Sequence, residues 1–136
     1  MPKLTLKNAI ESDFEDVFKL TKGLWPNKKF NKAAEKSEFL HEIKHKEVIV
    51  AKGGKRVLGV AITRIILGKI AFLDELIVHK KHHHVGTHLL EKVYYFSKQN
   101  SCNFIFLLCA PHRKSSYVFY RDHGFKRLFF LFYRSI

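Results

Sequence analysis

The sequence predicts a single α/β (α+β) domain over residues 1–136, with a mixed, mostly antiparallel central sheet flanked by about four helices. Three observations lead to this prediction. With 136 residues the chain is long enough for one core, and 46% of them are hydrophobic, which is typical of a globular protein. Alternating or β-branched runs, typical of strands, are interspersed with segments of helical periodicity. Glycines lie between consecutive strand-like runs, as in β-hairpins.

The first third of the chain predicts one strand followed by two helices. Polar and apolar residues alternate over residues 3–9, which is the pattern of a half-exposed strand. Ser12 and Glu15 have the spacing of a capping box, and they predict a helix that continues to about Leu24. A second, more polar helix is expected over residues 31–46. Its inward side is expected to carry four apolar residues: Ala34, Phe39, Leu40 and Ile43.

The middle third predicts three antiparallel strands in a meander. Residues 47–51 and 56–66 are rich in Val and Ile, and a Gly-Gly turn at residues 53–54 lies between them. Gly68 predicts a second hairpin, which leads into a strand over residues 70–78. Because both connections are short, the three strands are expected to lie side by side in the sheet.

A basic loop and a helix follow these strands. The loop over residues 79–85 contains two lysines and four histidines, and Gly86 and Thr87 open an amphipathic helix that continues to about Asn100. Thr87 is expected to be the N-cap of this helix. A helix N-terminus presents unpaired N–H groups and the positive end of the helix dipole. This segment is therefore expected to bind an anion, above all a phosphate.

The last third predicts a buried strand over residues 104–110, a short helix over residues 115–122 and an aromatic strand over residues 127–134. The terminal strand could pair between subunits, which would give a homodimer. Cys102 and Cys109 are too far apart along an extended segment to form a disulfide. They are expected to be buried thiols, which suits a reducing compartment such as the cytoplasm.

The net positive charge of the chain favours partners that are negatively charged. Lys and Arg number 25 against 12 Asp and Glu, for a formal net charge of +13. Such a balance favours an anionic partner, either a phosphate-bearing small molecule or a nucleic acid, although no nucleic-acid-binding motif is apparent. No apolar run is long enough to span a membrane, and the N-terminal segment lacks the apolar block of a signal peptide.

Two motifs resemble those of the GNAT superfamily of acetyl-CoA-dependent N-acetyltransferases. The loop reads KHHHVG from Lys81 to Gly86, which is similar to the family pattern of Arg or Gln, two residues, Gly, one residue, and Gly or Ala. The later family motif of Phe-Tyr, three residues and Gly-Phe is matched by FYRDHGF at residues 119–125. The chain departs from the family at three positions. Lys81 replaces Arg or Gln, His84 replaces the first Gly, and Arg113 replaces a frequent Asn.

The resemblance implies how acetyl-CoA would bind as a co-substrate, without a metal. A splayed or bulged strand would pair its backbone with the pantetheine arm, and the following phosphate-binding loop would hold the pyrophosphate. The positions implied for pantetheine are Leu76, Ile77 and Val78. Those implied for the pyrophosphate are Lys81, His82, His83, His84, Val85, Gly86 and Thr87. Arg113, in the place of the family's Asn, is a further candidate for cofactor binding.

Transfer to an amine also requires an acid and a base. Tyr120 is the candidate acid, because a phenol with a pKa of about 10 is protonated at neutral pH and can protonate a thiolate. Asp74 and Glu75 are the candidate bases, and as neighbours in a strand they are expected to face opposite sides of the sheet. Asp74 is preferred because of its spacing from Val78. His112 is an alternative base.

The predicted function is transfer of an acetyl group from acetyl-CoA to a primary amine, on a small molecule or a peptide, by direct attack in a ternary complex. Two alternatives remain, a basic nucleic-acid-binding module and a protein that binds CoA without catalysis, because a fold does not fix a function. The high positive charge disfavours a polycationic acceptor unless the pocket itself is acidic.

Overall fold

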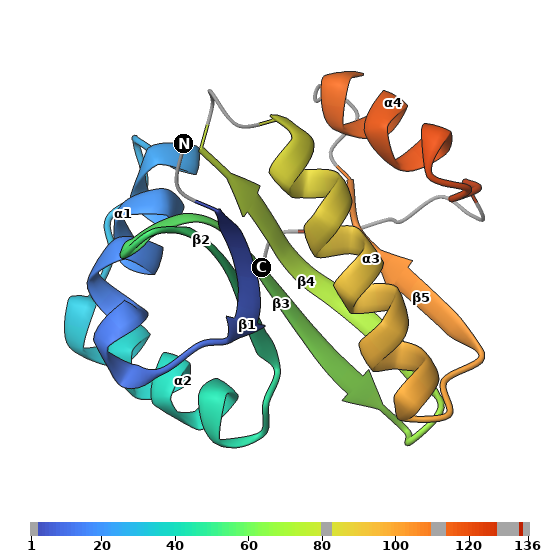
Figure 1. The fold of residues 1–136 in the computed structure, drawn as a ribbon, viewed down its shortest axis with the longest axis horizontal. Coiled ribbons are helices and arrows are strands. Elements are labelled where there is room, and N and C mark those ends of the chain that lie inside the picture. Colours follow the sequence, from blue (N-terminus) through green and yellow to red (C-terminus); the bar gives the residue numbers. More distant parts are fainter. Residues whose placement is uncertain (1–2, 80–82, 110–113, 128–133, 135–136) are drawn as a thin grey trace.

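The computed structural model describes residues 3–79, 83–109, 114–127 and 134, and it contains a five-stranded sheet with helices on both faces (Figure 1). The described elements are β1 (Leu4–Asn8), the 3-10 turn η1 (Glu11–Asp13), α1 (Phe14–Leu24), α2 (Lys32–Lys44), β2 (Val48–Gly53), β3 (Arg56–Ile66), β4 (Ile70–Val78), α3 (His83–Gln99), β5 (Phe104–Leu107) and α4 (Lys114–Asp122). The predicted α/β class, with a mostly antiparallel sheet and about four helices, is confirmed. The expected terminal strand over residues 127–134 lies almost wholly outside the described residues.

The sheet separates two apolar cores. Helices α1 and α2 cover one face, where the buried side chains include Phe14, Phe39, Val60, Ile62 and Ile77. Helix α3 covers the other face, and residues of α4 pack partly buried against the same core. Its buried side chains include Leu73, Val85, Leu89, Leu90 and Val93. Helices α1 and α3 therefore show the apolar stripes that the sequence periodicity predicted.

The strands lie in the order β1-β2-β3-β4-β5, and the expected meander of β2, β3 and β4 is confirmed. Neighbouring strands from β1 to β4 are antiparallel, whereas β4 and β5 are parallel. The parallel pairing begins at Ile70 with Phe104 and ends at Leu73 with Leu107. Because β5 ends at Leu107, the part of β4 from Asp74 to Val78 has no partner strand on that edge among the described residues.

Helix α1 begins differently from the prediction. The expected capping box of Ser12 and Glu15 is wrong, because Asp13 supplies the carboxylate at this helix start. Asp13 Oδ2 accepts a hydrogen bond of 2.9 Å from the Ile10 N–H. The Asp13 side chain is also drawn inward by an ion pair with Lys52 of β2, and only 4% of Asp13 is exposed. An ion pair between residues so distant in sequence overrides the local capping pattern.

The inward side of α2 was also predicted in part wrongly. Asn31 is its N-cap, with Oδ1 accepting from the Ala34 N–H at 3.1 Å, and Phe39 is buried as expected. Ala34, however, is exposed, and Glu42 is buried with 5% of its surface accessible. The reason lies on the sheet, where Arg64 of β3 bonds to Glu42.

Helix α3 begins at His83, three residues before the predicted start. Thr87 therefore lies in the second turn and is not the N-cap. Close packing fixes the helix on the sheet, because a Cβ at Gly59 of β3 would lie 2.9 Å from side-chain atoms of both Val85 and Leu89. Only glycine allows this approach.

Strand β5 is shorter and more exposed than predicted. It ends at Leu107, and Phe104 is 62% exposed, because β5 is the edge of the described sheet. Cys102 and Cys109 lie just outside the strand; both are half-buried, and neither forms a disulfide. Among the described residues, no helix has the length and apolar character needed to cross a membrane.

Candidate active site

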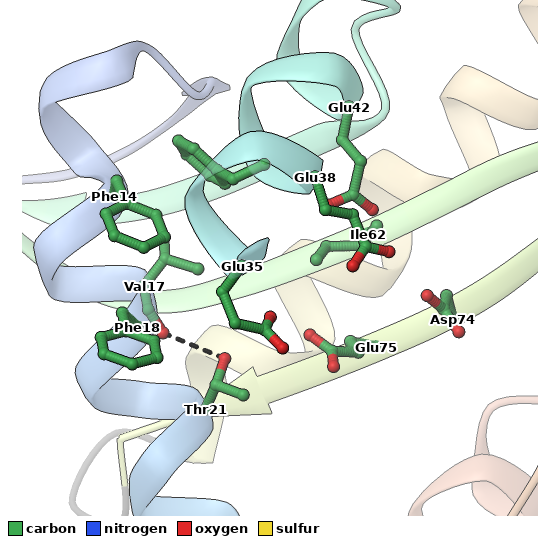
Figure 2. A pocket seen from close by; sticks show the side chains of 11 residues that line it. Phe14, Val17, Phe18, Thr21, Glu35, Glu38, Glu42, Ile62, Asp74 and Glu75 are labelled. Atoms are coloured by element: carbon green, nitrogen blue, oxygen red, sulfur yellow. Dashed lines mark hydrogen bonds between the residues drawn. The ribbon is translucent and has the colours of Figure 1, made fainter. Parts of the chain in front are cut away.

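An open pocket with a cavity volume of about 50 Å³ lies between α1, α2 and the strands β3 and β4 (Figure 2). One part of its wall is apolar, and Thr21 adds a hydroxyl there; the apolar side chains are Phe14, Val17, Phe18, Phe39 and Ile62. The other part is acidic and consists of Glu35, Glu38, Glu42, Asp74 and Glu75. A site lined by five carboxylates contrasts with the net charge of +13 of the whole chain.

Helix α2 contributes three of these carboxylates as a row. Glu35, Glu38 and Glu42 are spaced by three and four residues, so they lie on one face of the helix. That face is turned toward the sheet, where Phe39 is packed against the α1 side chain Phe14 at a ring separation of 5.5 Å. The sequence predicted a polar helix with an apolar inward side, and the acidic row on it was not predicted.

Strand β4 contributes the other two carboxylates through a β-bulge. Ile62 of β3 pairs with Glu75, and the next residue, Thr63, pairs with Leu73, so Asp74 is an extra residue. A bulge places two neighbouring residues on the same side of a strand. Both Asp74 and Glu75 therefore line the pocket on the α1–α2 side (Figure 2). The expectation that they face opposite sides is wrong, because it assumed a regular pleat.

Arg64 of β3 holds one end of the acidic wall together. Its Nη2 lies 2.8 Å from Glu38 Oε1, 2.9 Å from Glu42 Oε2 and 3.3 Å from Asp74 Oδ2. The hydrogen bond to Glu38, together with those charges, raises the pKa of Arg64 above its ordinary value. The guanidinium therefore stays charged and links α2 to both strands. The sequence analysis missed Arg64 as well.

Two of the five carboxyl groups have strongly raised pKa values. Burial, followed by the charge of Asp74, raises the pKa of Glu75 to about 7. Burial also raises the pKa of Glu42 to about 7, against the opposing effect of Arg64, whose guanidinium is shared among three carboxylates. A carboxylate whose pKa lies near neutrality can accept and release a proton at physiological pH.

Glu35 and Glu75 differ from the carboxylates that Arg64 holds. Within the part of the chain that the structure describes, neither side chain has a hydrogen bond or an ion pair with another residue. Figure 2 shows them pointing toward one another from α2 and β4, beside Thr21. The negative charge of Glu35 is also among the causes that raise the pKa of Glu75. This end of the pocket is therefore negative and available to a cation.

The segment of β4 that follows the bulge contains the three residues expected to face pantetheine. Leu76, Ile77 and Val78 pair with β3 on one edge, and on the other edge no described strand pairs with them, because β5 has ended at Leu107. Ile77 is directed to the α1–α2 face, whereas Leu76 and Val78 pack on the α3 face. Backbone groups of Leu76 to Val78 on the edge of β4 that faces away from β3 are thus positioned to pair with an extended ligand.

The start of α3 lies after this segment of β4. Lys81 and His82 fall outside the described residues, as do Arg113 and His112, so their expected roles stay predictions. The first turn of α3 contains His83, His84, Val85 and Gly86. Its backbone N–H groups have no acceptor within the helix, which is the arrangement that binds phosphate.

Side chains in this turn have structural contacts of their own. Val85 is fully buried, so only its backbone could contact a ligand. A Cβ at Gly86 would lie 3.4 Å from the Phe119 ring and 3.6 Å from Val78, which is ordinary van der Waals contact, so Gly86 lies where α3 meets α4. Thr87 Oγ1 lies 3.2 Å from His123 Nε2, next to the end of α4. Helix α4 is thus tied to the start of α3.

Tyr120 lies on α4 and belongs to the core on the α3 face of the sheet. Its ring packs against Phe119 at 5.3 Å and against Phe125 at 5.6 Å. Burial, with a smaller effect of Cys109, raises the pKa of Tyr120 to about 12, so the phenol is protonated at neutral pH. The structure brings Asp74 and Glu75 together, but Tyr120 does not line their pocket.

A metal site is not evident in the described residues, where no three His, Cys, Asp or Glu side chains are arranged to share an ion. The arrangement contains instead a basic helix start, an open strand edge and an acidic pocket on the other face of the same strand. These features suit a ligand with phosphates on one side of the sheet and a cation on the other.

Comparisons with known proteins agree with this arrangement. The sequence profile of the Acetyltransferase (GNAT) family matches residues 11–125. The aminoglycoside N-acetyltransferase AAC(6′)-Iy in complex with CoA has a similar structure, with a TM-score of 0.84 and 17% identity over 99% of this chain and 96% of that chain. AAC(6′)-Iy with the bisubstrate analog CoA-S-monomethyl-acetylneamine gives a TM-score of 0.82 at 17% identity, over 98% of this chain and 99% of that chain.

A transcriptional regulator from Bacillus halodurans C-125 also has this fold, with a TM-score of 0.84 and 19% identity over 98% of this chain and 100% of that chain. At such identities the likeness of these structures shows the fold alone. Among curated proteins, no sequence matches the chain.

Proposed function

Since this chain belongs to the Acetyltransferase (GNAT) family, we propose that it transfers the acetyl group of acetyl-CoA to a primary amine. The observation that carries the proposal is the geometry of β4. Its edge from Leu76 to Val78 has no partner strand among the described residues, and the bulge before that segment directs Asp74 and Glu75 into the pocket. One strand could therefore hold the thioester and the acceptor next to each other, which is what direct attack requires.

The residues of the chain fit coenzyme A in two places. Backbone groups of Leu76, Ile77 and Val78 would pair with the pantetheine arm, and the N–H groups of His83 to Gly86 would hold the pyrophosphate. Lys81, His82, Thr87 and Arg113 complete the proposed binding set. The complex of AAC(6′)-Iy with CoA supports this part of the proposal, because its fold is the same.

The proposed acceptor is a small molecule with a primary amine, bound between α1 and α2. The bisubstrate analog in AAC(6′)-Iy, which joins CoA to acetylneamine, supports an acceptor of this kind in a protein of the same fold. A peptide amine is the second possibility within the same reaction. Both would enter the pocket as an ammonium ion that must lose a proton before it attacks.

Glu75 is the base in this proposal. Its carboxylate takes a proton from the ammonium, and the neutral nitrogen then attacks the thioester carbonyl, so that a C–N bond forms and the C–S bond breaks. Tyr120 donates its phenolic proton to the departing sulfur and is afterwards reprotonated from solvent. After the C–N bond has formed, the nitrogen loses its second proton to solvent. The products are an N-acetyl amide and free CoA, and the first proton of the ammonium leaves through Glu75.

The structure favours Glu75 over Asp74, which the sequence analysis preferred. Asp74 Oδ2 forms an ion pair with Arg64 Nη2 at 3.3 Å. A carboxylate that is already paired with a guanidinium is less available to an incoming ammonium. Glu75, by contrast, has a pKa raised to about 7 and no bonded partner among the described residues. Of the two neighbouring carboxylates, Asp74 therefore pairs with Arg64, and Glu75 is left to act as the base.

An assay of acetyl-CoA with a panel of amines tests the proposed function. Release of free CoA thiol should depend on the amine, and mass spectrometry should find a product that is heavier by one acetyl group. Binding of CoA without any acetylated product across the panel would point to the non-catalytic alternative. Absence of CoA binding at low salt would remove the proposal, and binding of duplex DNA in the same assay would favour the nucleic-acid alternative.

We also propose the cytoplasm as the site of action. Acetyl-CoA is available there, and the half-buried thiols of Cys102 and Cys109 are compatible with a reducing compartment. A homodimer stays a prediction, because the strand expected to form it lies almost wholly outside the described residues.

A further inference from the structure

Arg64 lies beside the bulge of β4 and connects it to α2. In β3, Ile62 pairs with Glu75 of the bulge, and Arg64 follows two residues later on the same face of the sheet. The guanidinium therefore lies next to the two acidic residues that the bulge directs into the pocket. Of these two, it forms an ion pair with Asp74 at 3.3 Å.

A single nitrogen atom of Arg64 makes the contacts to both elements. Nη2 donates to Glu38 Oε1 at 2.8 Å and to Glu42 Oε2 at 2.9 Å, so α2 accepts both of its hydrogens. Asp74 is therefore held by the charge of the guanidinium. Because the extra residue of a bulge is unpaired in the ladder, this contact fixes its direction, and with it the backbone from which Glu75 projects.

The charges that face Glu75 come from three elements. Four carboxyl groups lie around it, one on its own strand and three on α2: Asp74, Glu35, Glu38 and Glu42. The part of α1 that lines the pocket contributes uncharged side chains: Phe14, Val17, Phe18 and Thr21. Burial, and after it the charges of the four carboxylates, raises the pKa of Glu75 to about 7. Arg64 of β3 is paired with three of the four and therefore offsets part of their charge.

We propose that Arg64 is a positioning residue for the base: it holds the bulge so that Glu75 points into the pocket, and its charge offsets the carboxylates around Glu75. The inference rests on the proposed function and adds to it a residue that does not touch the substrate. Without Arg64, three carboxylates would lose their counter-ion, and the negative charge that faces Glu75 would increase. Glu75 would then keep its proton to a higher pH and would be a poorer base at neutral pH.

The test measures the pKa of Glu75 in the intact protein by NMR of the carboxyl carbons, whose Glu75 signal is identified by its absence from Glu75→Gln. In Arg64→Gln this pKa should rise by roughly one pH unit. The midpoint of the pH profile of kcat/KM for acetyl transfer should rise by the same amount, so the loss of activity should diminish at higher pH. A purely structural role would instead lower kcat/KM equally at every pH.

Three further variants serve as controls. Arg64→Lys keeps the charge and should return both the pKa of Glu75 and the pH profile most of the way to those of the unmodified protein. In Arg64→Gln/Asp74→Asn, the loss of one carboxylate should offset part of the rise. Arg121→Gln removes an exposed arginine of α4 that pairs with Asp122 at 3.4 Å, and it should change neither measurement.

The outcomes separate the inference from the proposed function. An unchanged pKa of Glu75 in Arg64→Gln, or a rise that Arg64→Lys repeats in full, would overturn the inference while acetyl transfer itself stands. If the unmodified protein acetylates no amine, the proposed function fails, and the NMR titration still decides whether Arg64 controls the protonation of Glu75.

A second pair of variants covers the case in which a melting curve shows Arg64→Gln to be unfolded. Glu42→Gln is then compared with Arg64→Gln/Glu42→Gln, because the buried carboxylate that would be left without its partner is absent from both. The pKa of Glu75 should again be higher in the double variant, and equal values in the two proteins would overturn the inference.

Discussion

Glu75 is the residue at which base catalysis can be tested most directly. Replacement by Gln keeps the size of the side chain but removes the proton acceptor, so kcat/KM for acetyl transfer should fall by roughly 10²- to 10⁴-fold. In the unmodified protein kcat/KM should rise with pH through about 7, because deprotonation of Glu75 creates the base. That rise should be absent from the pH profile of Glu75→Gln.

Asp74→Asn is the control for this measurement. Asp74 bonds to Arg64 and does not act as the base in our proposal, so its replacement should lower kcat/KM by less than roughly tenfold. If Asp74→Asn proves as damaging as Glu75→Gln, and Glu75→Gln keeps the pH dependence, the base is Asp74.

Tyr120→Phe tests the acid. The change keeps the ring that packs on Phe119 and Phe125 but removes the proton that the departing thiolate would take. Turnover should fall by roughly 10²- to 10⁴-fold, with little change in the Kd of acetyl-CoA. If the hydroxyl is incidental, turnover will be unchanged and stability will shift by only about 1 kcal/mol, which steady-state kinetics and a melting curve distinguish.

The sequence predicted the acidic residues of β4 but not their arrangement. A bulge inserts one extra residue into a strand and leaves the composition of the strand unchanged. In the sequence, the bulge is indicated by Leu73 and Leu76, which lie on the same face although they are three residues apart. The row on α2 was missed for another reason. Three glutamates on one helix face are usually solvated, but here Glu38 and Glu42 bond to Arg64 of the sheet, which lies 22 residues beyond Glu42.

At the scale of elements, the contact between α3 and α4 should affect binding of the co-substrate. His123 Nδ1 lies 2.7 Å from the Phe119 carbonyl oxygen, so this nitrogen is the donor and Nε2 of the neutral ring accepts from Thr87. His123→Ala should loosen the start of α3 and weaken CoA binding by roughly 3- to 10-fold, the value of one hydrogen bond. Isothermal calorimetry gives the change in Kd.

His88→Ala is the matched control for this variant. His88 is the next residue of α3 after Thr87. Its side chain is 49% exposed, lies 3.8 Å from the exposed Glu91 and has its ring centroid 6.3 Å from that of His84. Its replacement should leave CoA binding unchanged. An unchanged Kd in His123→Ala would show that the link to Thr87 does not position the helix start.

The presence of most helices and strands could be predicted from the sequence, but the residues at which they begin were predicted less accurately. The period of apolar residues identified α1, α3 and the meander, because burial of one face is a property that local sequence records. The starts of α1 and α3 were misplaced because they depend on contacts distant in sequence. Asp13 is fixed by Lys52, and the first turn of α3 is fixed by its packing against Gly59.

At the scale of the whole molecule, the two raised pKa values make stability depend on pH. Glu42 and Glu75 have an ordinary pKa of 4.5 and a pKa of about 7 in the folded protein. Between these values the unfolded chain binds fewer protons than the folded one, so the contribution of both groups to stability falls as pH rises from 4.5 to about 7.

Melting curves across this pH range should show the effect. To remove the contribution of other ionisable groups, the measure is the difference between the unmodified protein and Glu42→Gln or Glu75→Gln. Either variant should lose less stability than the unmodified protein as pH rises. Glu91→Gln should follow the unmodified protein. Parallel curves for all four proteins would contradict the assigned protonation states.

The net charge of +13 predicts a strong effect of salt on CoA binding. Screening shortens the Debye length from about 30 Å at 0.01 M to about 3 Å at 1 M ionic strength. The affinity for CoA should therefore fall several-fold over this range, mainly through a slower association rate. Stopped-flow measurement of binding at three salt concentrations checks this, and a rate that does not depend on salt would show that steering is unimportant.

The bulge in β4 also determines where this strand tolerates a change of length. If Asp74 were deleted, Leu73 would still pair with Thr63 and Glu75 with Ile62, and the alternation of faces would become regular. Deletion of Phe72, in the regular part of the strand, would instead move the side chains between that point and the bulge to the opposite face of the sheet. Natural variants one residue shorter at Asp74 could thus keep their sheet and Glu75, and they would lose only a partner of Arg64.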